Sequence, residues 1–339
     1  KLFSKYTKKI LVIDDLNKNK HYCDYYLNYS PSIKKEKVKL IKNNTITYLG
    51  LDYFILDDAY KQKEIKIKKN IKNILIFLSF TDHRNLTGKL LKIFFQKKFD
   101  KYQFHIVLGV NRENLFNNYK RKNFKFYYGI KNLYDLLKKM DLALGSGGTN
   151  LWERFYMQIP SITFQIAKNQ KNSIDFLLKR KCILKSKNFK KKNVEDLFDK
   201  LLKNKNLYLN NLKENQYLLD RFGSDRIIFN LSNPSLNKLK IENFNPIDKN
   251  FLYKLANDES NRKFSFNPKK IKYSDHLEWF KKRSKSKETK IFLLKYKDLQ
   301  LGQIRFEKKR NFFEIDYSID KPFRGSGIGN YMVNTAILN

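Results

Sequence analysis

Two glycine-rich turns in this sequence have the residue types and the spacing of anion-binding sites. The first lies in the segment 141–154, where an apolar strand passes through a glycine cluster into a helix, and the second is the segment 324–329, between a strand and a helix. Glycine lets the backbone approach a ligand closely, and the free N–H groups of a first helical turn suit a pyrophosphate. Each turn therefore predicts a phosphorylated ligand, and a tight turn without a ligand is the alternative interpretation of each.

Side chains that follow the first turn fit the same chemistry. Thr149 or Asn150 can cap the helix, because both side chains carry an oxygen that accepts a backbone N–H. Glu153 comes one helical turn later and can accept hydrogen bonds from ribose hydroxyls. The first turn therefore predicts a nucleotide as its ligand.

Short apolar runs and amphipathic stretches must position these turns. The runs that predict buried strands are 10–13, 74–78, 105–108 and 142–144, and the stretches that predict helices are 86–95, 132–140 and 194–202, with helix continuing to about 220. Alternating strands and helices predict an α/β fold with a mostly parallel, doubly wound sheet.

The pattern changes near Pro234, which stands among small polar residues that suit a linker. The later segments that predict helices are 251–257 and 275–283, and those that predict strands are 291–294, 301–306 and 313–319. This order predicts a second, smaller, mixed α/β domain over residues 236–339.

The formal net charge of +38 is spread over the whole chain. Arg, the usual reader of phosphate forks and base edges, contributes only about a sixth of the basic residues. This dispersion argues against a dedicated nucleic-acid interface, so we expect no nucleic-acid partner. The charge still favours anionic small ligands.

Cys23 and Cys182 are too few for a disulfide scaffold or a four-ligand zinc site, and we expect no metal. No apolar run approaches the length of a membrane span, so we expect no membrane partner and a cytoplasmic protein. The chain begins at Lys1 without a methionine and ends at Asn339 inside an apparent helix. We therefore expect a fragment at both ends.

Residues 8–230 resemble the UDP-2,4-diacetamido-2,4,6-trideoxy-β-L-altropyranose hydrolases of pseudaminic acid biosynthesis, which are GT-B-like. The segment Asp141–Arg154, Pro160–Ile162 and Asn169–Gln170 carry most of the likeness, and 11–16, 85–87 and 222–226 add to it. The resemblance implies a remnant of the N-terminal GT-B domain at 1–70 and the nucleotide-sugar-binding C-terminal GT-B domain at 71–231.

Carried over to this chain, the resemblance assigns the diphosphate to Gly147, Gly148 and Thr149, and the ribose to Glu153. It places Asn169 and Gln170 in the nucleotide-sugar cleft. The family has a glycine pair where this chain has Ser79 and Phe80, which narrows the backbone's approach to a ligand.

The family's catalytic histidine precedes anything that matches Lys1. The four histidines of this chain, none of which takes its place, are His21, His83, His105 and His276. We therefore expect the first half of the chain to bind the nucleotide sugar without hydrolysing it.

The second turn matches the (Arg or Gln)-x-x-Gly-x-(Gly or Ala) signature of the GNAT N-acetyltransferases. Its residues, which the resemblance assigns to the pyrophosphate of acetyl-CoA, are Arg324, Gly325, Ser326, Gly327, Ile328 and Gly329. The backbone from Tyr317 to Ile319 would orient the acetyl group. His276 or Glu314 would accept the amine proton, although His276 beside Trp279 can equally be a packing residue.

Together the two resemblances imply consecutive steps on a UDP-linked amino sugar. One is N-acetylation by the co-substrate acetyl-CoA, and the other is hydrolytic release of UDP. Two alternatives remain open. The first is a GT-B glycosyltransferase fused to an unrelated GNAT acetyltransferase, and the second is a basic protein that binds nucleic acid without catalysis.

Overall fold

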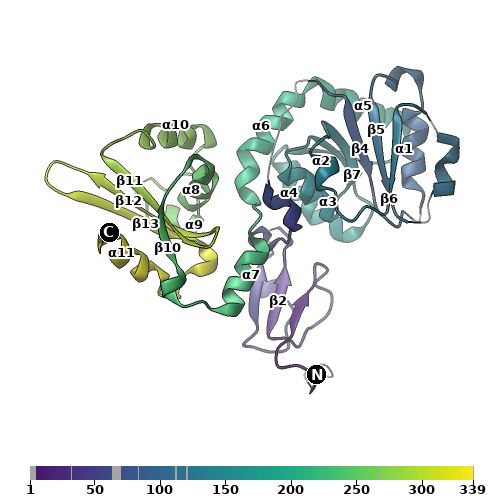
Figure 1. Cartoon of the computed structure of the whole chain (residues 1–339). Coiled ribbons are helices and arrows are strands. Elements are labelled where there is room, and N and C mark those ends of the chain that lie inside the picture. Colours follow the sequence, from purple (N-terminus) through teal and green to yellow (C-terminus); the bar gives the residue numbers. More distant parts are fainter. Residues whose placement is uncertain are drawn as a thin grey trace. The chain divides into compact units, whose positions relative to one another are not determined.

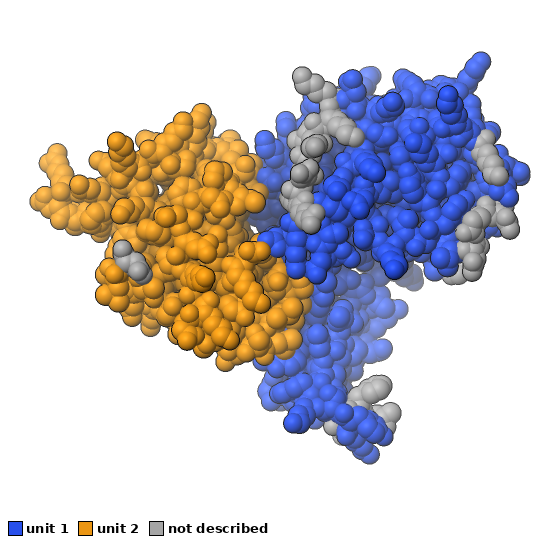
Figure 2. All heavy atoms as spheres, viewed as in Figure 1, with its two compact units in different colours: residues 1–221 blue, residues 222–339 orange. Residues whose placement is uncertain are grey.

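The chain divides into two compact units, Lys1–Arg221 and Phe222–Asn339 (Figure 2). The computed structural model describes residues 5–31, 33–62, 70–82, 84–110, 113–119, 121–265 and 267–338. His83 lies outside these ranges. No helix of this part of the chain is both long and apolar enough to cross a bilayer.

A six-stranded parallel sheet forms the centre of the first unit. Its order is β6-β5-β4-β7-β8-β9, and its strands are β4 (Asn73–Phe77), β5 (Gln103–Leu108), β6 (Phe124–Tyr128), β7 (Leu142–Ser146), β8 (Ser161–Phe164) and β9 (Ile183–Ser186). From β4 the chain adds β5 and β6 on one side, and from β7 it adds β8 and β9 on the other side. The predicted α/β class and doubly wound parallel sheet are thereby confirmed.

Helices cover both faces of this sheet (Figure 1). They are α1 (Leu86–Phe94), α2 (Tyr134–Leu137), α3 (Thr149–Tyr156), α4 (Lys171–Lys179), α5 (Lys191–Lys203) and α6 (Lys205–Asn215). Alternate residues of one strand belong to different cores, because successive side chains of a strand point to opposite faces. Ile74 and Ile76 pack with the core that contains Phe94 and Phe198. Both faces are buried, so the strands read as continuous apolar runs.

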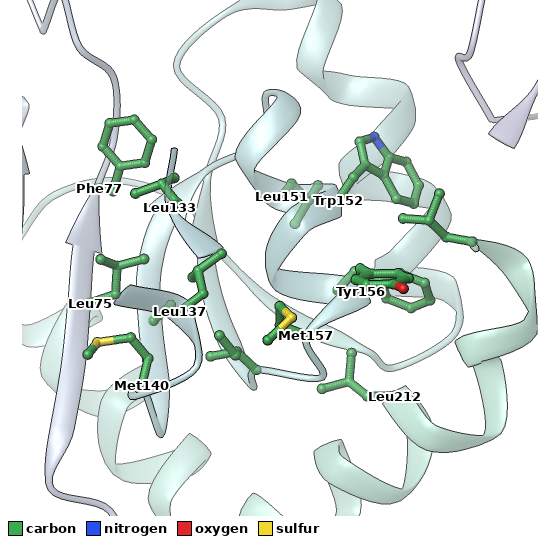
Figure 3. Packing of buried hydrophobic residues seen from close by; sticks show 14 of the residues in the cluster. Leu75, Phe77, Leu133, Leu137, Met140, Leu151, Trp152, Tyr156, Met157 and Leu212 are labelled. Atoms are coloured by element: carbon green, nitrogen blue, oxygen red, sulfur yellow. The ribbon is translucent and has the colours of Figure 1, made fainter. Parts of the chain in front are cut away.

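The core on the other face contains Leu75 and Phe77 of β4 and the apolar side of α3 (Figure 3). Trp152 is only 2% exposed and its ring centroid lies 6.1 Å from that of Phe54. Burial of side chains of this size stabilises a fold by about 1.5–3 kcal/mol each. This core therefore fixes the start of α3, where the first glycine turn ends.

Phe54 belongs to an N-terminal segment with a small parallel sheet of its own. Its strands are β1 (Leu11–Ile13), β2 (Tyr25–Asn28) and β3 (Ile46–Leu49). Tyr60 of the same segment packs edge-to-face on Tyr134 and Tyr156. The segment is thus anchored on α2 and α3 through aromatic contacts.

The second unit is built on an antiparallel sheet of order β10-β11-β12-β13. Its elements are α7 (Gly223–Ser232), β10 (Lys240–Asn243), α8 (Lys249–Ala256), α9 (Glu259–Lys263), α10 (Tyr273–Arg283), β11 (Thr289–Tyr296), β12 (Leu299–Lys308), β13 (Phe313–Ile319) and α11 (Ile328–Leu338). Helices α8 and α10 pack against Ile291 and Leu293 of β11. Helix α11 packs on the opposite face with Leu294 and Ile304.

The two units separate earlier in the chain than the predicted linker near Pro234. Helix α7, which the sequence assigns to the first domain, contributes Phe229 to the core of the second unit. The ring of Phe229 lies edge-to-face with Tyr296 and Phe323, at centroid distances of 5.2 and 5.1 Å. Apolar burial thus places this helix with the residues that follow it.

Candidate functional site

A cavity of about 380 Å³ opens at the carboxyl ends of β4 and β7. These two strands are neighbours, and the sheet winds outward from them in opposite directions. Crevices at such a switch point are where open α/β sheets bind their ligands. The residues that line the cavity are Phe77, Leu78, Ser79, Phe80, Lys131, Asn132, Leu133, Ser146, Gly148, Thr149, Asn150, Glu153, Ile166 and Gln170.

The glycines of the first turn differ in what the fold demands of them. A Cβ atom on Gly147 would lie 2.5 Å from Cδ1 of Ile174, so packing requires glycine there. A Cβ atom on Gly148 would meet nothing closer than 3.7 Å, and the φ of Gly148 is −78°, which any residue adopts. Neither space nor conformation explains glycine at 148, and this favours a ligand that approaches its backbone.

The peptide between Ser146 and Gly147 is held at both ends. The Nη2 of Arg154 donates to the carbonyl oxygen of Ser146 at 2.6 Å. The Gly147 N–H donates to the side-chain Oε1 of Gln170 at 3.3 Å, and the same oxygen accepts from the Ile166 N–H at 3.0 Å. The carboxamide NH2 of Gln170 has no acceptor among the described residues, and its position is compatible with the predicted role at the cavity.

The start of α3 differs from the predicted cap. Gly148 is the N-cap residue and no side chain caps the helix, so neither Thr149 nor Asn150 has the capping role that the sequence suggested. The amide of Asn150 instead donates to Oε2 of Glu153 at 3.0 Å. The backbone N–H groups at 148–150 have no acceptor in the described part of the chain. They therefore offer donors to an anion.

Glu153 lines the cavity, half-buried, where the sequence placed it. Burial and the Glu153 carboxylate raise the pKa of the Tyr60 phenol, so that phenol stays protonated at neutral pH. Asn169, by contrast, is not part of the cavity wall. Its amide lies 3.3 Å from Oδ2 of Asp15 and ties the loop after β8 to the N-terminal segment.

Phe80 stands where the resembled family has glycine. Its ring lies 4.9 Å from that of Phe77 and is 43% exposed at the cavity. The cavity exists in spite of this side chain. Phe80 therefore narrows the cavity without closing it.

The described histidines of the first unit are engaged elsewhere. The Nε2 of His21 lies 2.9 Å from Oδ2 of Asp14. His105 is buried in β5, with its ring nitrogens 2.8 Å from the Tyr127 hydroxyl and 3.1 Å from Oδ1 of Asn73. Among the described residues that line the cavity there is no histidine.

The second turn joins β13 to α11. Gly325 and Gly327 both have a φ of 78°, a left-handed conformation that favours glycine. A Cβ atom on either of them would meet nothing within 4 Å. Their backbone is thus open, and α11 begins at Ile328 with Gly329 as its second residue, inside the segment 324–329.

The guanidinium of Arg324 makes hydrogen bonds and an ion pair within the protein. Its Nε donates to the carbonyl oxygen of Ile319 at 2.8 Å, and its Nη2 lies 2.9 Å from Oδ1 of Asp258. Its Nη1 also donates to the Ser260 hydroxyl. Ser326 closes the turn, because its hydroxyl donates to the carbonyl oxygen of Phe323 at 2.6 Å. These contacts of Arg324 shape the turn, whereas the sequence assigned its side chain to a pyrophosphate.

His276 and Tyr317 line a second cavity, of about 570 Å³. The ring of His276 is 3% exposed, and its Nε2 donates to the carbonyl oxygen of Lys249 at 2.8 Å. Burial lowers the pKa of His276, and the bond to Lys249 only partly opposes that effect. His276 is therefore neutral at pH 7, with Nδ1 as the nitrogen that can accept a proton. It also stacks on Trp279 at 5.5 Å, so it packs as well.

Glu314 does not meet His276. Its carboxylate is exposed at the far end of β13, where Glu314 pairs in register with Glu307 and its Oε2 lies 3.3 Å from Nζ of Lys309. Glu314 is absent from the wall of the second cavity. Glu314 lies too early in β13 to reach this wall, which Tyr317 and Ser318 line from further along the same strand.

Sequence reasoning missed three charged residues of the second cavity, Asp275, Asp316 and Arg305. Asp316 and Arg305 form an ion pair at 2.9 Å. The position of Asp316 two residues after Glu314 on β13 was a usable signal, because residues two apart in a strand share a face. Lys131 of the first cavity was missed as well, since it follows β6, which the sequence did not predict. No group of three metal-ligating side chains occurs among the residues described.

No protein-family model matches this chain. It is 29% identical over 188 residues to the uncharacterized protein MJ1062 of Methanocaldococcus jannaschii, which covers 51% of this chain and 39% of that protein. It is 25% identical over 170 residues to the spore coat polysaccharide biosynthesis protein SpsG of Bacillus subtilis, covering 48% of this chain and 50% of that protein. The matches thus span half or less of these relatives.

Among solved structures, the glycotransferase of kitacinnamycin aligns with a TM-score of 0.47 and 13% identity. The alignment covers 62% of this chain and 55% of that one. A score at this level carries no argument about the function of this chain.

Proposed function

We propose that the first unit binds the nucleoside diphosphate of a nucleotide sugar, and that the second unit acetylates the amine of an amino sugar carried on such a nucleotide. The observation that carries the first part is the switch-point cavity, where the N–H groups at 148–150 have no acceptor in the described chain. Glycine at 148, which the fold does not demand, supports the same site.

The sugar in this proposal is supported by likeness in sequence. SpsG, one of the two curated relatives, is a spore coat polysaccharide biosynthesis protein by its name. The segment Asp141–Arg154 resembles the UDP-sugar hydrolases of pseudaminic acid biosynthesis. UDP and the diacetamido-trideoxy sugar are thus the ligands we propose for the first cavity.

We propose binding without hydrolysis for the first unit. Glu153 and Lys131 are the titratable side chains among the described residues of the cavity wall. Glu153 is held by Asn150 at 3.0 Å, which suits a ribose contact better than activation of water at the sugar carbon. Release of UDP at a steady rate by this chain would contradict this part of the proposal.

The second unit fits acetyl transfer through its turn and its cavity. The open turn at Gly325 and Gly327, next to the first turn of α11, suits the pyrophosphate of acetyl-CoA. When bound, acetyl-CoA supplies a thioester whose carbonyl carbon forms a bond with the amine nitrogen while its bond to sulfur breaks. His276 Nδ1 takes the proton that the amine loses. The backbone of Tyr317–Ile319, on an edge strand of the described sheet, holds the acetyl group in place.

Two glycines allow a direct test by calorimetry. Gly148→Val places a side chain in the first glycine turn, and Gly329→Val places one in the second. A Cβ atom at either position meets only ordinary contacts in the protein. We expect UDP to bind the wild-type chain and to lose affinity in Gly148→Val alone. Acetyl-CoA should lose affinity in Gly329→Val alone. Each variant is thus the control for the other.

A DNA duplex at two salt concentrations completes this test. Binding that falls steeply with salt and equals that of UDP would favour a basic nucleic-acid binder. Acetyl-CoA binding without UDP binding would leave only the acetyltransferase part of the proposal. Transfer of the sugar from a UDP-sugar to an acceptor would favour the glycosyltransferase alternative.

A further inference from the structure

Arg154 ends the motif segment 141–154, and the proposed site does not use it, although its side chain contacts the first turn at Ser146. Its side chain is fully buried, at 0% exposure. A Cβ atom on Gly145 would lie 1.8 Å from its Nη1, so the guanidinium fills the space that glycine leaves under the strand end. The charge is therefore fixed in place by packing.

The hydrogen-bonding needs of this guanidinium are only partly met. Nη2 donates to the carbonyl oxygen of Ser146 at 2.6 Å. Nε and Nη1 are buried and have no hydrogen-bond partner in the described part of the chain. None of the described carboxylates makes an ion pair with Arg154, and burial lowers its pKa to about 9, an effect that the nearby charge of Glu153 only partly opposes. The charge is thus without a full counter-charge.

A buried charge without a partner is unfavourable, because its loss of hydration is not compensated. Such a charge also acts strongly on a neighbouring anion, since the buried surroundings screen it less than water does. The wall of the first cavity includes Ser146, the residue that Arg154 contacts.

We propose that Arg154 is the electrostatic counterpart of the ligand's diphosphate, acting through the glycine turn from below. It is a positioning residue that does not itself line the cavity. It fixes the carbonyl oxygen of Ser146 and places a positive charge behind the free N–H groups at 148–150. The diphosphate in turn supplies the counter-charge that the guanidinium lacks.

This inference rests on the proposed function, and its test separates the two. UDP and uridine differ only in the diphosphate, so their affinities are measured by calorimetry at one ionic strength for the wild type and Arg154→Met. Arg121→Met is the matched control. It removes the same charge from the same unit, where Arg121 pairs with Asp100 at 2.9 Å near the amino ends of the strands.

We expect Arg154→Met to weaken UDP binding about ten-fold or more and to change uridine binding less than about two-fold. The ratio of the two affinities should stay near the wild-type value in Arg121→Met. The thermal midpoint of the ligand-free variants is measured alongside, because Arg154→Met also removes the donor to the Ser146 carbonyl oxygen. A purely structural role predicts a lower midpoint and an unchanged ratio.

An unchanged ratio in Arg154→Met overturns the inference while leaving the proposed function intact. Failure of the wild type to bind UDP overturns the proposed function instead. If Arg154→Met shows no cooperative unfolding, Arg154→Lys and Arg154→Gln replace it, since they differ in charge at one position. The lysine variant should keep more of the ratio than the glutamine variant, and equal ratios overturn the inference.

Discussion

The side-chain oxygen of Gln170 accepts a hydrogen bond from the backbone N–H of Gly147 at 3.3 Å and so connects the turn after β7 to the loop after β8. The same carboxamide directs its NH2 group to no acceptor among the described residues. The side-chain oxygen of Gln170 therefore has a structural role, whereas its NH2 group is available to a ligand.

Gln170→Glu separates these two roles. The carboxylate keeps an acceptor for Gly147 and Ile166, so the thermal midpoint should change little. It replaces the NH2 group with an oxygen, which repels a diphosphate. We expect UDP affinity to fall about ten-fold or more. Gln165→Glu, an exposed change of the same charge on the same loop, is the control, and an equal loss in both variants would rule out a local role of Gln170.

The two glycines of the first turn should respond differently to alanine. Gly147→Ala forces a methyl group against Cδ1 of Ile174, so we expect a loss of about 1–3 kcal/mol in the free energy of unfolding. Gly148→Ala should leave stability within about 0.5 kcal/mol, because the surrounding space is open. Denaturant titration of the two variants tests this. Equal losses would mean that Gly148 is also required for packing.

His276 should make the second unit sensitive to acid. Its pKa is lowered by burial from an ordinary value of 6.5. The unfolded chain therefore binds a proton more readily than the folded chain, and the stability present above pH 6.5 is lost as the pH falls toward the lowered value. His276→Gln can keep a donor for Lys249 but does not titrate. Between pH 7.5 and 5.5, the thermal midpoint of the wild type should fall more than that of this variant.

Parallel loss of midpoint in both proteins would mean that folding does not lower the pKa of His276. The same pair of proteins tests the proton acceptor. Acetyl transfer should fall by about 100-fold or more in His276→Gln if Nδ1 takes the proton. A small effect on the rate would leave His276 as a packing residue against Trp279, at the 5.5 Å ring distance found here.

Glu314 should not matter to acetyl transfer. Its carboxylate is exposed and pairs with Lys309 away from the second cavity. Exposed ion pairs contribute about 0–1 kcal/mol, so Glu314→Gln should leave the rate and the thermal midpoint nearly unchanged. Asp316→Asn, two residues along β13 and paired with Arg305 in the cavity wall, should lower kcat/KM. A larger effect of Glu314→Gln than of Asp316→Asn would contradict this placement.

The sequence predicted the parts of the fold that follow from local pattern. Apolar runs such as 142–144 and glycines before a helix are local signals, and the parallel sheet and both turns were placed from them. The strand β8 (Ser161–Phe164) was missed because it is short, although it is buried on both sides. Its sequence does not distinguish it from a turn after Pro160.

Contacts between distant residues were beyond sequence reasoning. Asn169 and Gln170 are adjacent in the chain, yet one faces Asp15 and the other the glycine turn. The direction of each side chain depends on a single 3-10 turn at Lys168–Gln170, which no periodic pattern in the sequence predicts. Arg324 likewise binds Asp258, a partner that only the tertiary fold brings near.

Helix α7 sets where the two halves of this protein can be exchanged or inherited separately. Phe229 lies in the core of the second unit, together with Phe323 just ahead of the second glycine turn. If the chain were divided at the polar linker near Pro234, the core of the second unit would lose the ring of Phe229. A division just before Phe222 would keep that core complete. A naturally separate counterpart of the second half is therefore expected to begin with its own version of this helix.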